Sequence, residues 1–114
     1  MSNKTKRIVI LNEVELKQTL LRLTSEIIEK VKKTLHNVNM ASKMYFQSKG
    51  EITFDIELLE NSGQLGIDSS IKEMWTFTSD ANGSLFTAVS TDAFPEGSGI
   101  KIFYNPQNRK YLIQ

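Results

Sequence analysis

Apolar residues recur at steps of three and four over the first half of the chain, the spacing that places them on one face of an α-helix. Asn12 stands three residues before Glu15, which is the spacing of a capping box at the start of a helix. A short apolar run rich in β-branched residues, 6–11, precedes them and predicts a strand. We therefore expect an N-terminal strand and then a long amphipathic helix with this apolar stripe: Leu16, Leu20, Leu23, Ile27, Val31, Leu35 and Val38.

The helical pattern continues to about residue 47. A helix of ~35 residues would be about 50 Å long, which exceeds the diameter of a domain of this size. Either the helix breaks near residues 37–39, or its far end packs on another subunit. Because Asn37 and Asn39 are poor helix formers, we expect a break, followed by a second apolar patch: Met40, Met44, Tyr45 and Phe46.

From Gly50 onward the spacing changes to two, which is typical of half-buried strands. Segment 51–58 alternates most regularly and predicts a strand, whereas 61–70 predicts a loop. Further strands are predicted at 71–80, 84–92, 100–105 and 110–114, with Asn82-Gly83 and Pro106 in the tight turns between them. The expected fold is α+β, with the strand and long helix packed on an antiparallel meander of about five strands.

The length of 114 residues predicts a single domain over 1–114. The chain has no cysteine, which excludes a disulfide framework and thiol chemistry. No apolar run approaches the ~20 residues that span a bilayer, and the run at 8–11 is too short for a signal peptide. We therefore expect a cytoplasmic protein.

The net charge of +1 hides an asymmetry between the two halves of the chain. Residues 1–50 carry ten Lys and Arg against four Glu, whereas residues 51–114 carry four against nine Asp and Glu. Such a distribution is typical of a protein that binds an anionic partner. It is also typical of halves that attract each other, within one chain or between two, and of an ordinary solvated surface. We expect a homo-oligomer.

The segment 92–99, followed by Lys101, has the composition of a phosphate-binding loop. Such a loop normally opens a helix, whose free N–H groups and positive partial charge hold the anion. Here alternating apolar residues follow at 100–104 and predict a strand, and neither the P-loop nor the dinucleotide spacing is present. We expect Gly97 and Gly99 to form a wide turn between strands, with a backbone anion nest as the alternative.

Candidates for catalysis are few. His36 is the only histidine, so no zinc set of the usual kind is present, and we expect no metal and no cofactor. Asp55 and Glu57 lie on one face of the predicted strand, roughly 7 Å apart by the strand rise. Carboxylates at that distance serve acid–base catalysis or bind Mg²⁺, although the wet side of a strand explains them equally well. The order of long helix and meander is similar to cystatin-like and nuclear-transport-factor-like folds, so a small enzyme on such a cone is one alternative.

A basic stripe on the predicted helix suggests a second alternative, a nucleic-acid-binding protein. It is formed by Lys32, Lys33, His36 and Lys43. A nucleic-acid interface needs clustered charge, often beside stacking aromatic rings. Because the overall charge is nearly balanced, we rank nucleic acid below the other partners.

The C-terminal hairpin concentrates cationic and aromatic side chains in an otherwise acidic half. Aromatic rings stack on bases, and arginine pairs with phosphate through its planar fork. Trp75 and Phe86 would complete a pocket for a nucleotide-like ligand, unless they belong to the core. The candidate ligand-binding residues are Lys101, Phe103, Tyr104, Arg109 and Lys110.

Because no catalytic motif is present, the sequence favours a small cytoplasmic binding protein without enzymatic activity. It would act by occupying a partner protein or by sequestering a small anionic ligand. Small inhibitors of host defence that phages and mobile elements encode work in this way and have a similar size and composition.

Overall fold

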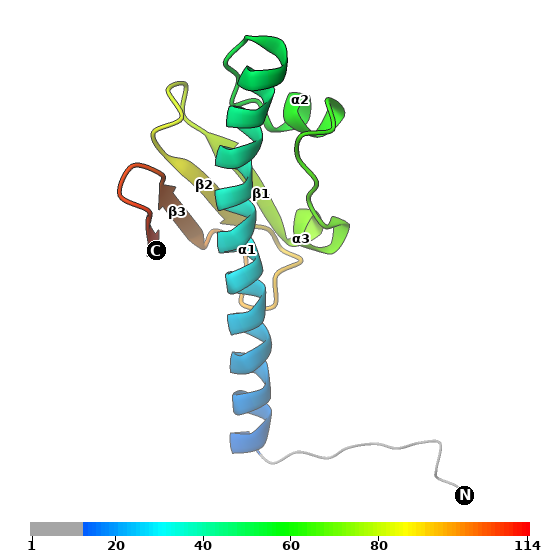
Figure 1. Ribbon diagram of the computed structural model, residues 1–114. Coiled ribbons are helices and arrows are strands. Elements are labelled where there is room, and N and C mark those ends of the chain that lie inside the picture. The colour runs from blue at the N-terminus through cyan, green and yellow to red at the C-terminus, as the bar shows by residue number, and fades with distance from the viewer. Residues whose placement is uncertain (1–12) are drawn as a thin grey trace, which may run out of the picture.

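The computed structural model describes residues 13–114, with side chains from residue 22 onward and that of Gln18 (Figure 1). The strand expected at 6–11 lies outside the described residues. Residues 13–114 form three helices and four strands in the order α1 (Glu13–Lys49), α2 (Ile56–Asn61), α3 (Ser69–Met74), β1 (Trp75–Ser79), β2 (Phe86–Ser90), β3 (Lys101–Asn105) and β4 (Lys110–Ile113). Within this part of the chain, no helix is both long enough and apolar enough to cross a membrane.

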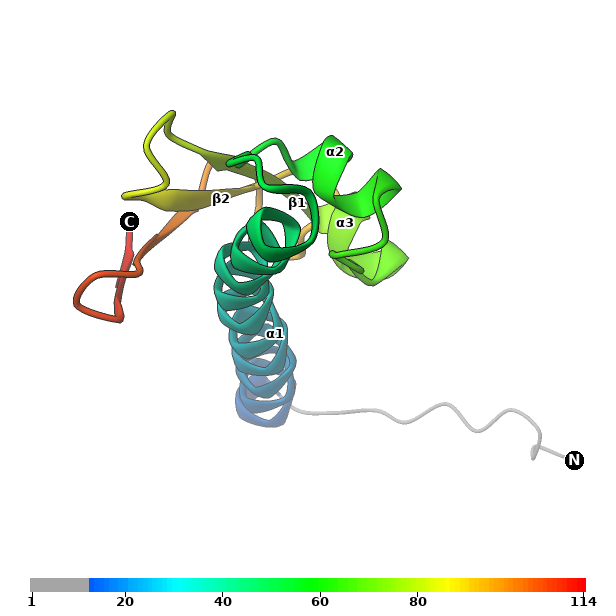
Figure 2. The same ribbon diagram turned by 45° about the horizontal axis from the view of Figure 1, so that its top comes forward.

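The four strands form one antiparallel sheet in the order β1-β2-β3-β4, and α1 packs on one of its faces. This confirms the predicted α+β fold of a long helix on a meander, with four strands in the described residues. The inward side chains alternate along the strands, so that Phe86, Ala88 and Ile102 are fully buried beneath α1. Figures 1 and 2 show α1 crossing the sheet, with α2 and α3 together on the β1 side.

The predicted break near residues 37–39 is wrong, because α1 is a single helix of 37 residues. Leu35 and Val38 are each 1% exposed and pack in the core. Burying such a side chain contributes about 1.5–3 kcal/mol, which outweighs the ~0.7 kcal/mol that asparagine costs in a helix. Of the predicted second patch, Tyr45 is buried, whereas three members stay exposed: Met40, Met44 and Phe46.

The N-terminal part of α1 projects beyond the rest of the molecule (Figures 1 and 2). Val31 is fully buried against the sheet, but Leu23, two turns earlier on the same apolar stripe, is 47% exposed. The radius of gyration is 17.9 Å, against about 13 Å for a compact chain of this length. The helix is therefore longer than the body it packs on.

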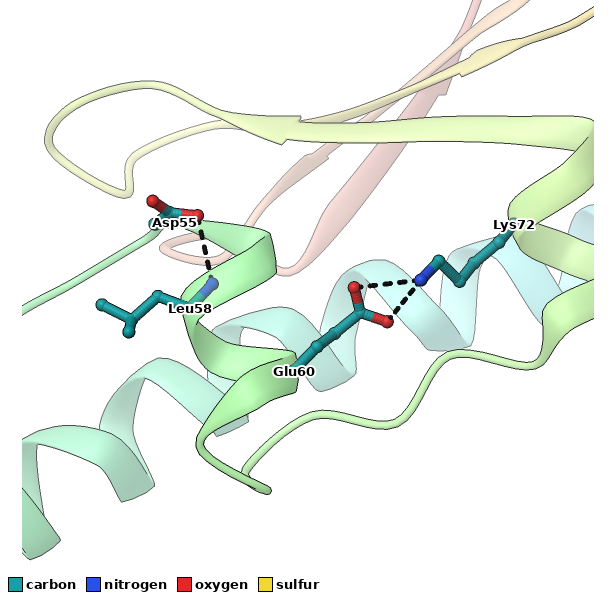
Figure 3. A network of polar contacts seen from close by, with 4 residues as sticks. All are labelled: Asp55, Leu58, Glu60 and Lys72. Carbon is teal, nitrogen blue, oxygen red and sulfur yellow. Dashed lines mark hydrogen bonds and ion pairs between the residues drawn. The ribbon is translucent and has the colours of Figure 1, made fainter.

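The alternating segment 51–58 is not a strand, contrary to the prediction. Asp55 caps α2, because its Oδ1 accepts a hydrogen bond of 3.2 Å from the backbone N–H of Leu58 (Figure 3). Such a cap satisfies one of the free N–H groups at a helix start. It is followed by a helical turn that buries Leu59 completely and leaves Leu58 40% exposed. The local cap therefore outweighs the alternating pattern.

The predicted loop 61–70 ends in a second short helix, α3, and the predicted strand 71–80 begins only at Trp75. Asp68 caps α3 by accepting a 2.9 Å hydrogen bond from the backbone N–H of Ser70. Lys72 in α3 pairs with Glu60 in α2 at 3.0 Å, so an ion pair joins the two short helices (Figure 3).

Both predicted hairpins are present. In the β1–β2 turn only Gly83 has a positive φ, of 67°. Asp80 organises this turn by accepting from the backbone N–H groups of Ser84 (2.8 Å) and Leu85 (3.3 Å). The β3–β4 turn contains Pro106, as predicted, and ends at Arg109, whose N–H donates to the carbonyl of Asn105 at 2.8 Å.

Candidate functional site

The sheet separates the five candidate residues of the C-terminal hairpin. Tyr104 is 2% exposed and faces α1, whereas its neighbour Phe103 faces away, as alternation along a strand requires. Lys101 projects from the same outer face as Phe103, and Lys110 lines a hollow on that side with Phe103. Arg109 lies at the end of the turn and reaches the α1 side, where it lines a hollow with Tyr104.

This second cavity, the central hollow, has a volume of about 430 Å³ between α1 and the β3–β4 hairpin. The phenol oxygen of Tyr104 lies 3.3 Å from Nδ1 of His36, so a polar contact joins strand to helix. The rings of Tyr104 and Tyr111 stack with their centroids 4.7 Å apart. The residues that line it are His36, Asn39, Met40, Lys43, Tyr104, Pro106, Arg109 and Tyr111.

The charge of the central hollow is positive. Lys43 on α1 and Arg109 on the turn are both exposed, and no Asp or Glu among the described residues lines this space. Arg109 has a φ of 60°, a left-handed conformation that is uncommon outside glycine. The turn therefore holds a cationic side chain beside α1 in a backbone conformation that favours glycine.

A neighbouring hollow continues along α1 toward its N-terminus. There the hydroxyl of Tyr111 donates to the backbone carbonyl of Lys32 at 3.1 Å, and the Lys32 ammonium lies 5.5 Å from the centroid of the Tyr111 ring. Lys32 also pairs with Glu29 at 3.3 Å. Burial raises the pKa of the Tyr111 phenol, with Tyr104 and Glu29 acting in the same direction. Lys33 and His36 complete this lysine hollow.

The structure therefore joins two groups of residues that the sequence suggested separately. His36 and Lys43 belong to the predicted basic stripe of the helix, and they meet Tyr104 and Arg109 from the hairpin. Sequence reasoning missed Tyr111, although a signal exists for it. The β3–β4 register places Tyr111 directly opposite Tyr104, so a register derived from the turn around Pro106 would have found it.

The loop 92–99 is a connection between β2 and β3, as predicted. The N–H of Gly97 donates to the carbonyl of Phe94 (2.9 Å), and that of Gly99 to the carbonyl of Ser90 (3.0 Å). Both donors are satisfied by backbone carbonyls and are not free to hold an anion. Phe94 is 2% exposed, so the loop is anchored in the core.

The predicted Trp75–Phe86 pocket and the predicted Asp55–Glu57 carboxylate pair are not formed. Trp75 and Phe86 are at most 1% exposed and belong to the core rather than to a ligand pocket. Asp55 and Glu57 do not share a strand face, because Asp55 caps α2 (Figure 3) and Glu57 lies in the first turn of that helix.

Comparison of the chain with protein-family models, with curated proteins and with solved structures found no match. A function for this protein is therefore inferred from the geometry of the central hollow and its neighbours.

Proposed function

We propose that this protein binds a ligand carrying a phosphate or similar anionic group in the central hollow, without chemical turnover. One observation carries the proposal. Lys43 from α1 and Arg109 from the β3–β4 turn line the same space, beside His36 and with no carboxylate from the described residues. Like charges held close together repel each other, and an anion between them removes that repulsion.

Phosphate suits this arrangement better than a carboxylate does. The planar guanidinium of Arg109 presents parallel donors that match two phosphate oxygens, and a lysine adds a compact charge. Besides Arg109 and Lys43, the central hollow is lined by Tyr104 and His36, whose hydroxyl oxygen and Nδ1 lie 3.3 Å apart. A phosphate has enough acceptor oxygens to receive donors from all three sides. A nucleotide-like ligand is the smallest common molecule that also offers a ring to the nearby aromatic residues.

Calorimetric titration with inorganic pyrophosphate and with adenosine monophosphate at low ionic strength tests the proposal. Arg109→Ala and Lys43→Ala should each weaken binding about tenfold or more, since a hydrogen bond to a charged group contributes about 1.5–3 kcal/mol. Lys101→Ala is the matched control, because it removes the same charge from the outer face of the sheet. Equal losses in Lys101→Ala and Arg109→Ala would place the ligand elsewhere.

Native mass spectrometry of protein purified gently from its own cells gives an independent check. The expected result is extra mass that disappears on denaturation and corresponds to a phosphate-bearing compound. A second polypeptide bound to a protein with no extra small-molecule mass would contradict the proposal and support the alternative, in which the protein occupies a partner protein.

We also propose that the protein self-associates through the projecting part of α1. Leu23 is 47% exposed on the stripe that buries Val31 completely. The helix runs about three turns from Thr24, whose hydroxyl contacts Glu96 of the loop 92–99, back to its start at Glu13. A second copy of this chain fits this surface, because its own α1 presents the same apolar stripe at the same position along the helix. A two-fold pairing of identical helices needs no other component.

Light scattering coupled to size exclusion tests this second proposal. The wild-type protein should elute with the mass of a dimer or larger assembly, and Leu23→Glu should elute as a monomer. Gln18→Glu is the control, since it adds the same charge to the projecting segment at a position away from the stripe. A monomeric wild type would reject self-association.

A further inference from the structure

Three hollows lie next to one another along α1 and are together called the groove. The lysine hollow and the central hollow share His36 and Tyr111, and the central hollow shares Asn39 and Lys43 with a third. This third one, the apolar hollow, has a volume of about 400 Å³. It is lined by Asn39, Ser42, Lys43, Phe46, Gln47, Ile52, Phe54 and Gly83.

The groove is long enough for several phosphates. Its α1 wall runs from Lys32 to Phe46, which is about 21 Å at 1.5 Å per residue. Adjacent phosphates of a B-form strand rise about 3.4 Å along the duplex axis, whereas in an extended single strand they lie roughly 6–7 Å apart. A segment of about four nucleotides therefore spans the groove, whereas a single nucleotide fills one hollow only.

The charges along the groove are those of a polyanion-binding surface. Four lysine and arginine residues and one histidine line it between the lysine hollow and Lys43, where the apolar hollow begins. Among the described residues, Glu29 is the single carboxylate of the lining, and it is paired with Lys32. The cations are Lys32, Lys33, Lys43 and Arg109, and the histidine is His36.

An exposed aromatic ring stands at the apolar end of the groove, where Phe46 is 50% exposed beside the partly buried Phe54. The ring of Tyr111 is already engaged, because it stacks on Tyr104 and lies 5.5 Å from the Lys32 ammonium. A cationic groove that ends at an exposed aromatic ring suits a single strand, because an unpaired base stacks on the ring while the phosphates meet the cations. Paired bases in a duplex do not present their faces in this way.

We propose that the groove binds a single-stranded nucleic acid over about four nucleotides, with phosphates on Lys43 and Arg109 and a base on Phe46. This inference rests on the proposed phosphate site and extends it in both directions along α1. The sequence alone ranks nucleic acid below the other partners, because it does not show that the hairpin and the basic stripe share one groove.

Fluorescence anisotropy with a labelled oligothymidylate of four residues tests the inference, with thymidine monophosphate as competitor. The tetranucleotide should bind at least tenfold more tightly than the mononucleotide. Its log affinity should fall with log salt at a slope of about −2 to −3, as expected for roughly three to four neutralised phosphates on a single strand. Phe46→Ala should weaken the tetranucleotide about tenfold through lost stacking and leave the mononucleotide unchanged.

Lys110→Ala is the matched control for charge, since it lies on the outer face of the sheet. Equal affinity for the mononucleotide and the tetranucleotide would overturn the extended groove and leave the phosphate site standing. If the wild-type protein binds neither nucleotides nor pyrophosphate, both the extended groove and the phosphate site are rejected. Undiminished tetranucleotide binding in Phe46→Ala, together with equal competition by polyglutamate, would show simple polyanion exchange and overturn the inference.

Discussion

The ring of Phe54 fills the space beside Gly83 where a Cβ would lie. Phe54 is held there by an edge-to-face contact with the buried Phe86, at a centroid separation of 6.1 Å. Gly83 has a φ of 67°, which disfavours any L side chain. One glycine therefore satisfies two constraints at once, a left-handed backbone and a close aromatic neighbour, and it helps to shape the apolar hollow.

We expect Gly83→Ala to lower the free energy of unfolding by about 2–3 kcal/mol, because backbone strain and displacement of the ring add. Gly63→Ala separates the two effects, since Gly63 has a φ of 86° and open space around it, and should cost about 1 kcal/mol. Gly66→Ala, with neither constraint, should be nearly neutral. Urea denaturation measures all three, and equal costs for Gly83 and Gly63 would show that Phe54 moves freely.

Asp80 makes the β1–β2 turn sensitive to acid. A hydrogen bond from the Ser84 hydroxyl holds the pKa of Asp80 below its ordinary value of 3.8, with backbone N–H groups helping and partial desolvation opposing. A carboxyl whose pKa is lower in the folded state stabilises the fold above its unfolded pKa, and that stability is lost as the pH falls through the folded pKa.

We therefore expect Asp80→Ala to melt at a lower temperature than wild type at pH 7. The difference should stay constant down to about pH 5 and shrink below about pH 4. Thermal denaturation between pH 7 and pH 2.5 measures it, with Asp92→Ala, an exposed aspartate of the loop 92–99, as the control. A difference that does not change with pH would mean that the carboxylate charge plays no part.

Arg109 should separate stability from binding. Its φ of 60° disfavours a side chain, so Arg109→Gly should raise the free energy of unfolding by about 0.5–1 kcal/mol. The same change removes a cation from the central hollow and should weaken pyrophosphate binding as much as Arg109→Ala does. Denaturation and calorimetry on the two variants provide the comparison. A glycine variant less stable than the alanine variant would show that the left-handed turn is not strained.

Leu23 and Leu35 stand on the same sequence stripe but have different environments, at 47% and 1% exposed. Leu35→Ala should cost about 3 kcal/mol at every protein concentration, because it opens a cavity in the core. Leu23→Ala should cost about 0.5 kcal/mol or less in dilute solution and more as the concentration rises, since association stabilises by mass action. Denaturation at several concentrations measures both. A concentration-independent cost for Leu23→Ala would contradict self-association through α1.

The sequence predicts a long amphipathic helix followed by a meander correctly, because both follow from periodicity along the chain. The break predicted near Asn37 and Asn39 is wrong, because burial of the apolar stripe outweighs the low helix propensity of asparagine. Leu35 and Val38 mark the buried face of α1, and the alternation from Trp75 onward marks the strands. It fails at 51–58, where alternation favours a strand while Asp55 offers a helix cap. The cap prevails because the helical turn that it starts buries Leu59 completely, and periodicity contains no information about which side chains the fold buries.

For the candidate site, too, the sequence predicts the residue types but not their contacts. Composition alone identifies the hairpin and the basic stripe of α1 as cationic and aromatic, because residue types are read directly. Which of those side chains meet depends on the side of the sheet that α1 covers and on the register that sets Tyr104 opposite Tyr111. The sequence by itself determined the long helix, the strands of the meander from Trp75 onward and the charges that they carry. Only the tertiary structure divided Phe103 from Tyr104 and brought His36 and Lys43 to Arg109, because contacts across a fold follow from packing rather than from spacing along the chain.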